Sequence, residues 1–127
     1  MKEISQQVLY QRIRNRVIEL LVLYTSLEDI ASLGAFEMVN MVDDWLPLDY
    51  DEAPNVFSEK EKEVVAEFME LVGNAADASD EDTWRVEWFK SSEQWVRLSK
   101  FAQQALVTFA ERGRFSEEYE VNLTAQP

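Results

Sequence analysis

The apolar residues at the start of the chain recur at steps of three and four positions, which is the spacing of one face of an α-helix. They run from Ile4 to Tyr24 and predict a long amphipathic helix. The second half of this helix is apolar on nearly every side, so we expect it to cross the centre of the core. Three arginines are expected on its polar face: Arg12, Arg14 and Arg16.

Capping signals and helix breakers divide the rest of the chain into further helices. A serine with an acidic residue three positions later satisfies the free amides of a helix start, and this pattern begins at Ser26 and at Ser58. The helical segment after Ser26 extends toward Pro47, with Gly34 either ending its first turns or absorbed in it. The segment after Ser58 is expected to end at Gly73, which suits a left-handed C-terminal cap.

Residues 47–57, which contain two prolines, and the small, acidic residues 74–83 are predicted to be loops. An aromatic segment begins at Trp84, and apolar residues at near-heptad spacing then predict a fourth major helix from Ser91 or Ser92. The fold class is therefore all-α. It is a helical bundle of four main helices plus short helical segments.

The predicted domain organisation is a single helical domain over residues 1–115. No internal repeat and no β-rich block competes with this prediction. Residues 116–127 contain a short alternating pattern and are expected to form a loosely held C-terminal tail.

Negative charge is concentrated in the middle of the chain. The 127 residues carry a formal net charge of −13, and residues 17–84 contain two lysines and eighteen acidic residues, a net charge of −16. Such a charge disfavours nucleic-acid backbones and anionic membranes, since both require positive protein charge. It also exceeds the magnitude of about 2 to 8 that solubility requires of a small domain. We expect no nucleic-acid and no membrane partner.

The acidic residues gather in two groups, and each adjoins large aromatic residues. Carboxylates attract a basic protein, and partly exposed aromatic rings supply the desolvated contact energy, so the pattern indicates a binding surface. The alternative interpretation is solvated surface acids with tryptophans in the core. The first group is Asp43, Asp44, Trp45, Asp49, Tyr50, Asp51 and Glu52, and the second is Asp77, Asp80, Glu81, Asp82 and Trp84.

The residue types present exclude most catalytic and metal chemistry. The chain has no Cys and no His, which removes disulfides, thiol and imidazole catalysis, and nearly every zinc, haem or iron–sulfur site. The acidic segment from Asp77 fails the calcium-loop pattern, because the turn-glycine position is Asp82 and the bidentate-glutamate position is Trp88. We predict no enzymatic activity, no catalytic residues, no cofactor and no metal.

A cytoplasmic location is expected from the absence of a targeting segment. The arginine-rich and apolar stretch over residues 12–24 is similar to a secretory signal, but Glu19 interrupts it and no cleavage site follows. No segment approaches the roughly 18 to 20 uninterrupted apolar residues of a membrane span.

Residues 12–47, RIRNRVIELLVLYTSLEDIASLGAFEMVNMVDDWLP, resemble part of a known family. An arginine-rich apolar helix, a capped short segment and a helix ending in Asp43-Asp44-Trp45 before a proline are similar to small acidic immunity proteins of bacterial contact-dependent growth inhibition and polymorphic-toxin systems. The resemblance implies a cytoplasmic antidote that binds a cognate toxin domain, often a basic nuclease, and blocks its active site. It implies no catalytic residues.

The leading hypothesis is an acidic immunity or inhibitor protein that occludes a basic toxin domain. A nucleic-acid mimic or regulatory adaptor that binds basic host proteins is the main alternative. An enzyme that uses carboxylates alone and a structural subunit with Trp45 and Trp84 in an oligomer contact are also open. The sequence leaves the toxin, the oligomeric state and the identity of the core tryptophans open.

Overall fold

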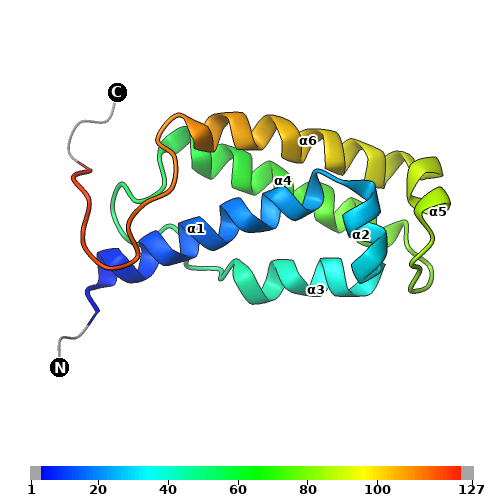
Figure 1. Ribbon diagram of the computed structural model, residues 1–127, viewed down its shortest axis with the longest axis horizontal. Coiled ribbons are helices and arrows are strands. Elements are labelled where there is room, and N and C mark those ends of the chain that lie inside the picture. Colours follow the sequence, from blue (N-terminus) through cyan, green and yellow to red (C-terminus); the bar gives the residue numbers. More distant parts are fainter. Residues whose placement is uncertain (1–3, 124–127) are drawn as a thin grey trace.

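The computed structural model describes residues 4–123 of the chain. Within those residues it contains six α-helices and no strand, so the all-α prediction is confirmed (Figure 1). The three longest helices have 18 or 19 residues each. The helices are α1 (Gln6–Tyr24), α2 (Leu27–Leu33), α3 (Ala35–Trp45), α4 (Glu59–Asp77), α5 (Val86–Ser91) and α6 (Glu93–Ala110).

The three long helices enclose the core, and α3 lies along the edge of the bundle. Helix α6 packs against both α4 and α1, and α1 packs on its other side against α3 (Figure 1). The helices meet at Tyr24, whose ring contacts the edge of Phe68 at 5.1 Å and stacks on Trp95 at 6.4 Å between centroids. All three side chains are fully buried. The second half of α1 therefore supplies the core as predicted, although Val22 remains about half exposed to solvent.

The serine residues that the capping pattern identified are the N-caps of helices α2 and α4. Ser26 Oγ accepts a hydrogen bond from the Asp29 amide at 3.2 Å, and Ser58 forms a complete capping box with Glu61. Each cap accepts hydrogen bonds from amides that have no partner within the helix. Because the contact spans three residues, the local sequence is enough to predict it. Of the two candidate starts of the last long helix, Ser92 is the one that caps α6.

The prediction that Gly73 ends its helix is wrong, because α4 continues to Asp77. Gly73 does not have the positive φ angle of a left-handed cap. Two residues later Ala75 is fully buried in the core, and burial of this side chain favours another turn of helix. Gly34 is the glycine that separates two helices: its φ angle of 92° ends α2 and begins α3.

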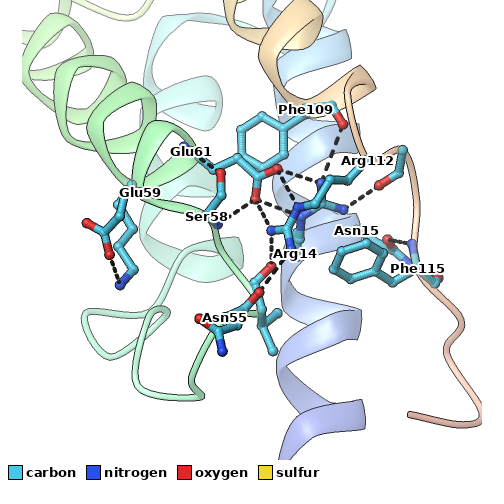
Figure 2. A network of polar contacts seen from close by, with 12 residues as sticks. Arg14, Asn15, Asn55, Ser58, Glu59, Glu61, Phe109, Arg112 and Phe115 are labelled. Carbon is cyan, nitrogen blue, oxygen red and sulfur yellow. Dashed lines mark hydrogen bonds and ion pairs between the residues drawn. The ribbon is translucent and has the colours of Figure 1, made fainter. Parts of the chain in front are cut away.

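The placement of Arg14 on a solvated polar face is also wrong. Its side chain is fully buried and donates to both carboxylate oxygens of Glu61, at 3.0 and 2.8 Å (Figure 2). Arg112 donates to the same carboxylate at 2.7 Å, and the Phe115 ring lies 4.0 Å from the Arg14 guanidinium carbon. This network ties α1 to the start of α4 and to the chain that leaves α6. Helical spacing could not reveal it, since the neutralising partners come from distant segments.

The chain after α6 turns back across the first turns of α1 (Figure 1). Asn15 exchanges two hydrogen bonds with the Phe115 backbone, at 2.8 and 3.0 Å. Gln11 bonds the Ser116 and Tyr119 carbonyls, and Leu123 is buried. The sequence favoured a loosely held tail from residue 116, but buried amide side chains of α1 hold it as far as residue 123. The rest of that tail, residues 124–127, lies outside the described residues.

Candidate protein-binding surface

Helix α3 turns one face to the core and the other to solvent. Its inner residues, among them Met38 and Val42, are buried. The opposite residues recur at helical spacing and are exposed, which makes them one continuous surface. We name this surface the α3 face and define it by Phe36, Glu37, Asn40, Asp43 and Asp44.

The first acidic group of the sequence lies at the C-terminal end of the α3 face. Asp43 and Asp44 occupy the last turn of α3, and the other acidic members lie in the loop that follows; all are exposed. Asp49 accepts a hydrogen bond of 2.9 Å from the Tyr10 hydroxyl, which holds this loop against α1. That bond, together with the field of the nearby carboxylates, raises the pKa of Tyr10 to about 12.

The aromatic residues of the first group are only partly available to a partner. Trp45 and Tyr50 are half-buried and pack against the core. The Tyr50 and Phe57 rings pack in a T-shaped arrangement, with their centroids 5.0 Å apart. The most exposed apolar side chain at this end is Leu48, at 91%, which the sequence analysis did not single out.

The second acidic group lies at the N-terminal end of α3. Asp82 Oδ1 accepts from the Phe36 amide at 3.0 Å, and the Thr83 carbonyl accepts from the Ala35 amide at 3.1 Å. Gly34 has no side chain to cap α3, so a loop from beyond α4 satisfies these amides instead. Asp80 and Glu81 are exposed in the same loop, and Asp77 is exposed in the last turn of α4.

An apolar patch adjoins this second group. Trp84 is 64% exposed, Phe36 48% and Leu33 36%. The indole Nε1 of Trp84 donates to the Leu33 carbonyl at 3.1 Å, so the ring lies where α2 and α3 join. We name these three residues the Trp84 patch. Of the remaining tryptophans, Trp95 is fully buried and the other two are half-buried.

The structure does not bring the two acidic groups into one cluster. They lie at opposite ends of α3, which has 11 residues and is therefore about 16 Å long at 1.5 Å per residue. Glu37 and Asn40 of the α3 face connect them, and the sequence analysis missed both. Helical spacing was the signal that could have found them, because position 37 lies one turn before 40 and two turns before 44.

The charge of this surface is not compensated. No Lys or Arg occurs between Arg16 and Lys60. Within residues 4–123, no acidic member of either group forms a salt bridge. The arginines near the chain termini pair with Glu19, Glu61 and Glu117 instead. The surface therefore presents carboxylates that are free to meet cations of another molecule.

A further groove lies elsewhere, between α4 and α6. Its volume is about 590 Å³, and its lining mixes acidic Glu67 and Glu70 with basic Arg97 and Lys100. In the described part of the chain, no three acidic side chains come together in a way that could hold a metal ion. None of the helices there is long and apolar enough to span a membrane.

Comparison with known proteins identifies no relative of this chain. No family model, no curated protein and no solved structure matches it.

Proposed function

We propose that this protein binds a basic protein domain through the α3 face and the acidic loops at its two ends, and thereby blocks that domain. In the form that the sequence resemblance implies, it is an immunity protein and the domain is its cognate toxin. Acidic and exposed apolar groups side by side support this proposal, since charge directs the encounter and apolar contacts hold the complex.

The observation that carries the proposal is the position of Asp43 and Asp44. Both lie in the last turn of α3, where the partial negative charge of the helix end disfavours carboxylates. Neither is paired with a cation within the described residues. Residues that lower the stability of their own helix and remain exposed are typical of a functional surface.

A nuclease is the toxin class that such a surface suits best. An enzyme that holds a nucleic-acid backbone needs a surface of Lys and Arg side chains. A row of carboxylates along α3 offers the same charges as a phosphate backbone, so it would occupy that surface and exclude the substrate. Association would reach about 10⁸ M⁻¹s⁻¹ at low salt and slow as salt is added.

The test is co-expression with the candidate toxin encoded beside this gene, followed by binding kinetics with the purified domain. One variant combines Asp43→Asn, Asp44→Asn and Asp51→Asn. The matched control removes three charges from the exposed side of α4 by the changes Glu63→Gln, Glu67→Gln and Glu70→Gln.

We expect the α3 variant to lose protection of the host cell and to associate at least tenfold more slowly, with the α4 control unchanged. Equal losses in both variants would mean that total charge, not the α3 face, determines binding, and no loss in either would refute the site. Binding to many basic nucleic-acid proteins, without a single cognate domain, would favour the regulatory adaptor instead.

A further inference from the structure

The Trp84 patch differs from the rest of the acidic surface because it offers exposed apolar rings. Leu33 and Phe36 come from the adjoining ends of α2 and α3, and Trp84 comes from the distant loop before α5. All three side chains are large, apolar and exposed to solvent. At the opposite end of α3, Leu48 is the exposed large apolar residue of the loop that follows the helix.

The indole of Trp84 is held in place before any partner arrives. Its Nε1 is bonded to the Leu33 carbonyl, and the ring covers Gly34 so closely that a Cβ atom there would lie 2.0 Å from Nε1. The neighbouring Phe36 is fixed through its backbone amide on Asp82. A rigid aromatic surface loses little conformational entropy on binding, which favours its use as an anchor.

Carboxylates accompany the rings at this position. Asp82 is joined to the patch through the Phe36 amide, and Glu37 is the next residue of the exposed α3 face. The nearest basic side chain in sequence, Arg85, lines a cavity together with Asp80 and Glu81 of the second acidic group. An aromatic surface with adjacent carboxylates suits a guanidinium group, which stacks on rings and donates to carboxylates at once.

We infer that the Trp84 patch is the anchor point of the basic partner and receives an arginine side chain of that protein. This inference rests on the proposed function and deepens it. The first acidic group begins at Asp43, about 10 Å along α3 from Phe36 at 1.5 Å per residue, and then serves to attract the partner. The patch supplies the contacts that slow dissociation.

The test uses the full chain labelled with ¹⁵N and two defined probes, the blocked peptides Gly-Arg-Gly-Arg-Gly and Gly-Lys-Gly-Lys-Gly, at low salt. NMR titration reports where each peptide binds and with what Kd. The variant is Phe36→Ala, which keeps the backbone amide that donates a hydrogen bond to Asp82. The matched control is Leu48→Ala, an exposed apolar side chain at the other end of the surface.

We expect the largest shifts from the arginine peptide at the Trp84 indole N–H and at the amides of residues 33–37. Phe36→Ala should weaken binding about fivefold, Leu48→Ala should leave the Kd unchanged, and the lysine peptide should bind several-fold more weakly.

Saturable shifts confined to residues 43–52 would refute the proposed role of the Trp84 patch. They would remain compatible with binding through the α3 face. Shifts spread evenly, or centred on the groove between α4 and α6, would overturn both the anchor and the proposed function. Absence of any saturable shift would overturn the anchor.

Discussion

Glu61 is buried at the start of α4 between two arginines. Burial raises the pKa of this carboxyl, but hydrogen bonds from Arg14 and Arg112 outweigh that effect, and the pKa is lowered overall. Its remaining neighbour, the Ser58 amide, donates at 3.1 Å as part of the capping box. One carboxylate therefore caps a helix and neutralises the fully buried Arg14 at the same time (Figure 2).

Glu61→Gln should lower the free energy of unfolding by about 3–5 kcal/mol, because it leaves the Arg14 guanidinium buried without a counter-charge. Denaturant unfolding at neutral pH measures this difference. The control is Glu63→Gln, two residues along on the exposed side of α4, which should change stability by less than about 0.5 kcal/mol.

The stability difference between wild type and Glu61→Gln should also depend on pH. Because the pKa of Glu61 is lower in the folded than in the unfolded chain, its contribution is complete above the unfolded value of about 4.3 and is lost as the pH falls through the folded value. The stability difference between wild type and Glu61→Gln should therefore shrink below about pH 4. A difference that stayed constant from neutral to acidic pH would contradict this account.

Gly34 and Gly73 should respond in opposite directions to substitution by alanine. Gly34 has a φ angle of 92° and the Trp84 indole over it, so Gly34→Ala adds backbone strain and a steric clash. Gly73 lies within α4 with no atom within 4 Å of a built Cβ, so Gly73→Ala should stabilise by about 0.5–1 kcal/mol. Thermal unfolding of the two variants checks both signs, and a neutral Gly34→Ala would refute the clash.

The two ends of α3 contribute to its stability in opposite directions. Its N-terminus has no side-chain cap of its own, and Asp82 supplies the missing acceptor from a loop 46 positions away. Its C-terminus carries Asp43 and Asp44 where basic residues are favourable. The tertiary contact stabilises the first end, and the acidic pair destabilises the second.

Asp82→Ala should lower the free energy of unfolding by about 0.5–2 kcal/mol, because the Phe36 amide loses its acceptor and the helix its cap. Asp82→Asn keeps an acceptor oxygen and removes the charge, so it should cost less. Chemical denaturation of both variants measures the ordering. Equal stability of Asp82→Ala and wild type would show that the loop does not cap α3.

Asp43→Asn together with Asp44→Asn should raise the free energy of unfolding by about 0.3–1 kcal/mol per residue, since each change removes a carboxylate from the negative end of α3. The same double variant should bind the basic partner more slowly. Thermal unfolding and association kinetics on one protein sample test both effects. A less stable double variant would contradict the helix-end argument.

Over the whole molecule, charge is compensated in some regions and uncompensated in others. The arginines at the N-terminal half of α1 and after α6 pair with Glu19, Glu61 and Glu117. The α3 face and its flanking loops contain uncompensated carboxylates, and the chain as a whole carries −13. Repulsion among these charges opposes the compact state, so the surface that we propose as functional also limits stability.

Added salt should therefore raise the melting temperature, because screening weakens this repulsion as the Debye length falls from about 30 Å at 0.01 M to about 8 Å at 0.15 M. The buried pair of Arg14 and Glu61 is screened much less. Scanning calorimetry of wild type against the Asp43→Asn, Asp44→Asn double variant checks this, with a smaller salt effect expected in the variant. A melting temperature that fell with salt would show that surface ion pairs dominate instead.

Features that depend on contacts between near neighbours could be predicted from the amino-acid sequence. The starts of α2 and α4 follow from Ser26 and Ser58, because a cap is a contact over three residues. The all-α class follows from apolar spacing. The excess of carboxylates in the middle of the chain, and hence the basic nature of the proposed partner, follows from composition.

Contacts between distant residues became visible in the folded chain alone. Arg14 is buried because Glu61, 47 positions later, neutralises it. The two acidic groups are separated because α3 lies between them, and the exposed Trp84 indole is fixed because its loop docks on Gly34. Each outcome is a contact between residues far apart in the chain, and periodicity and capping patterns report only on residues within a few turns of one another.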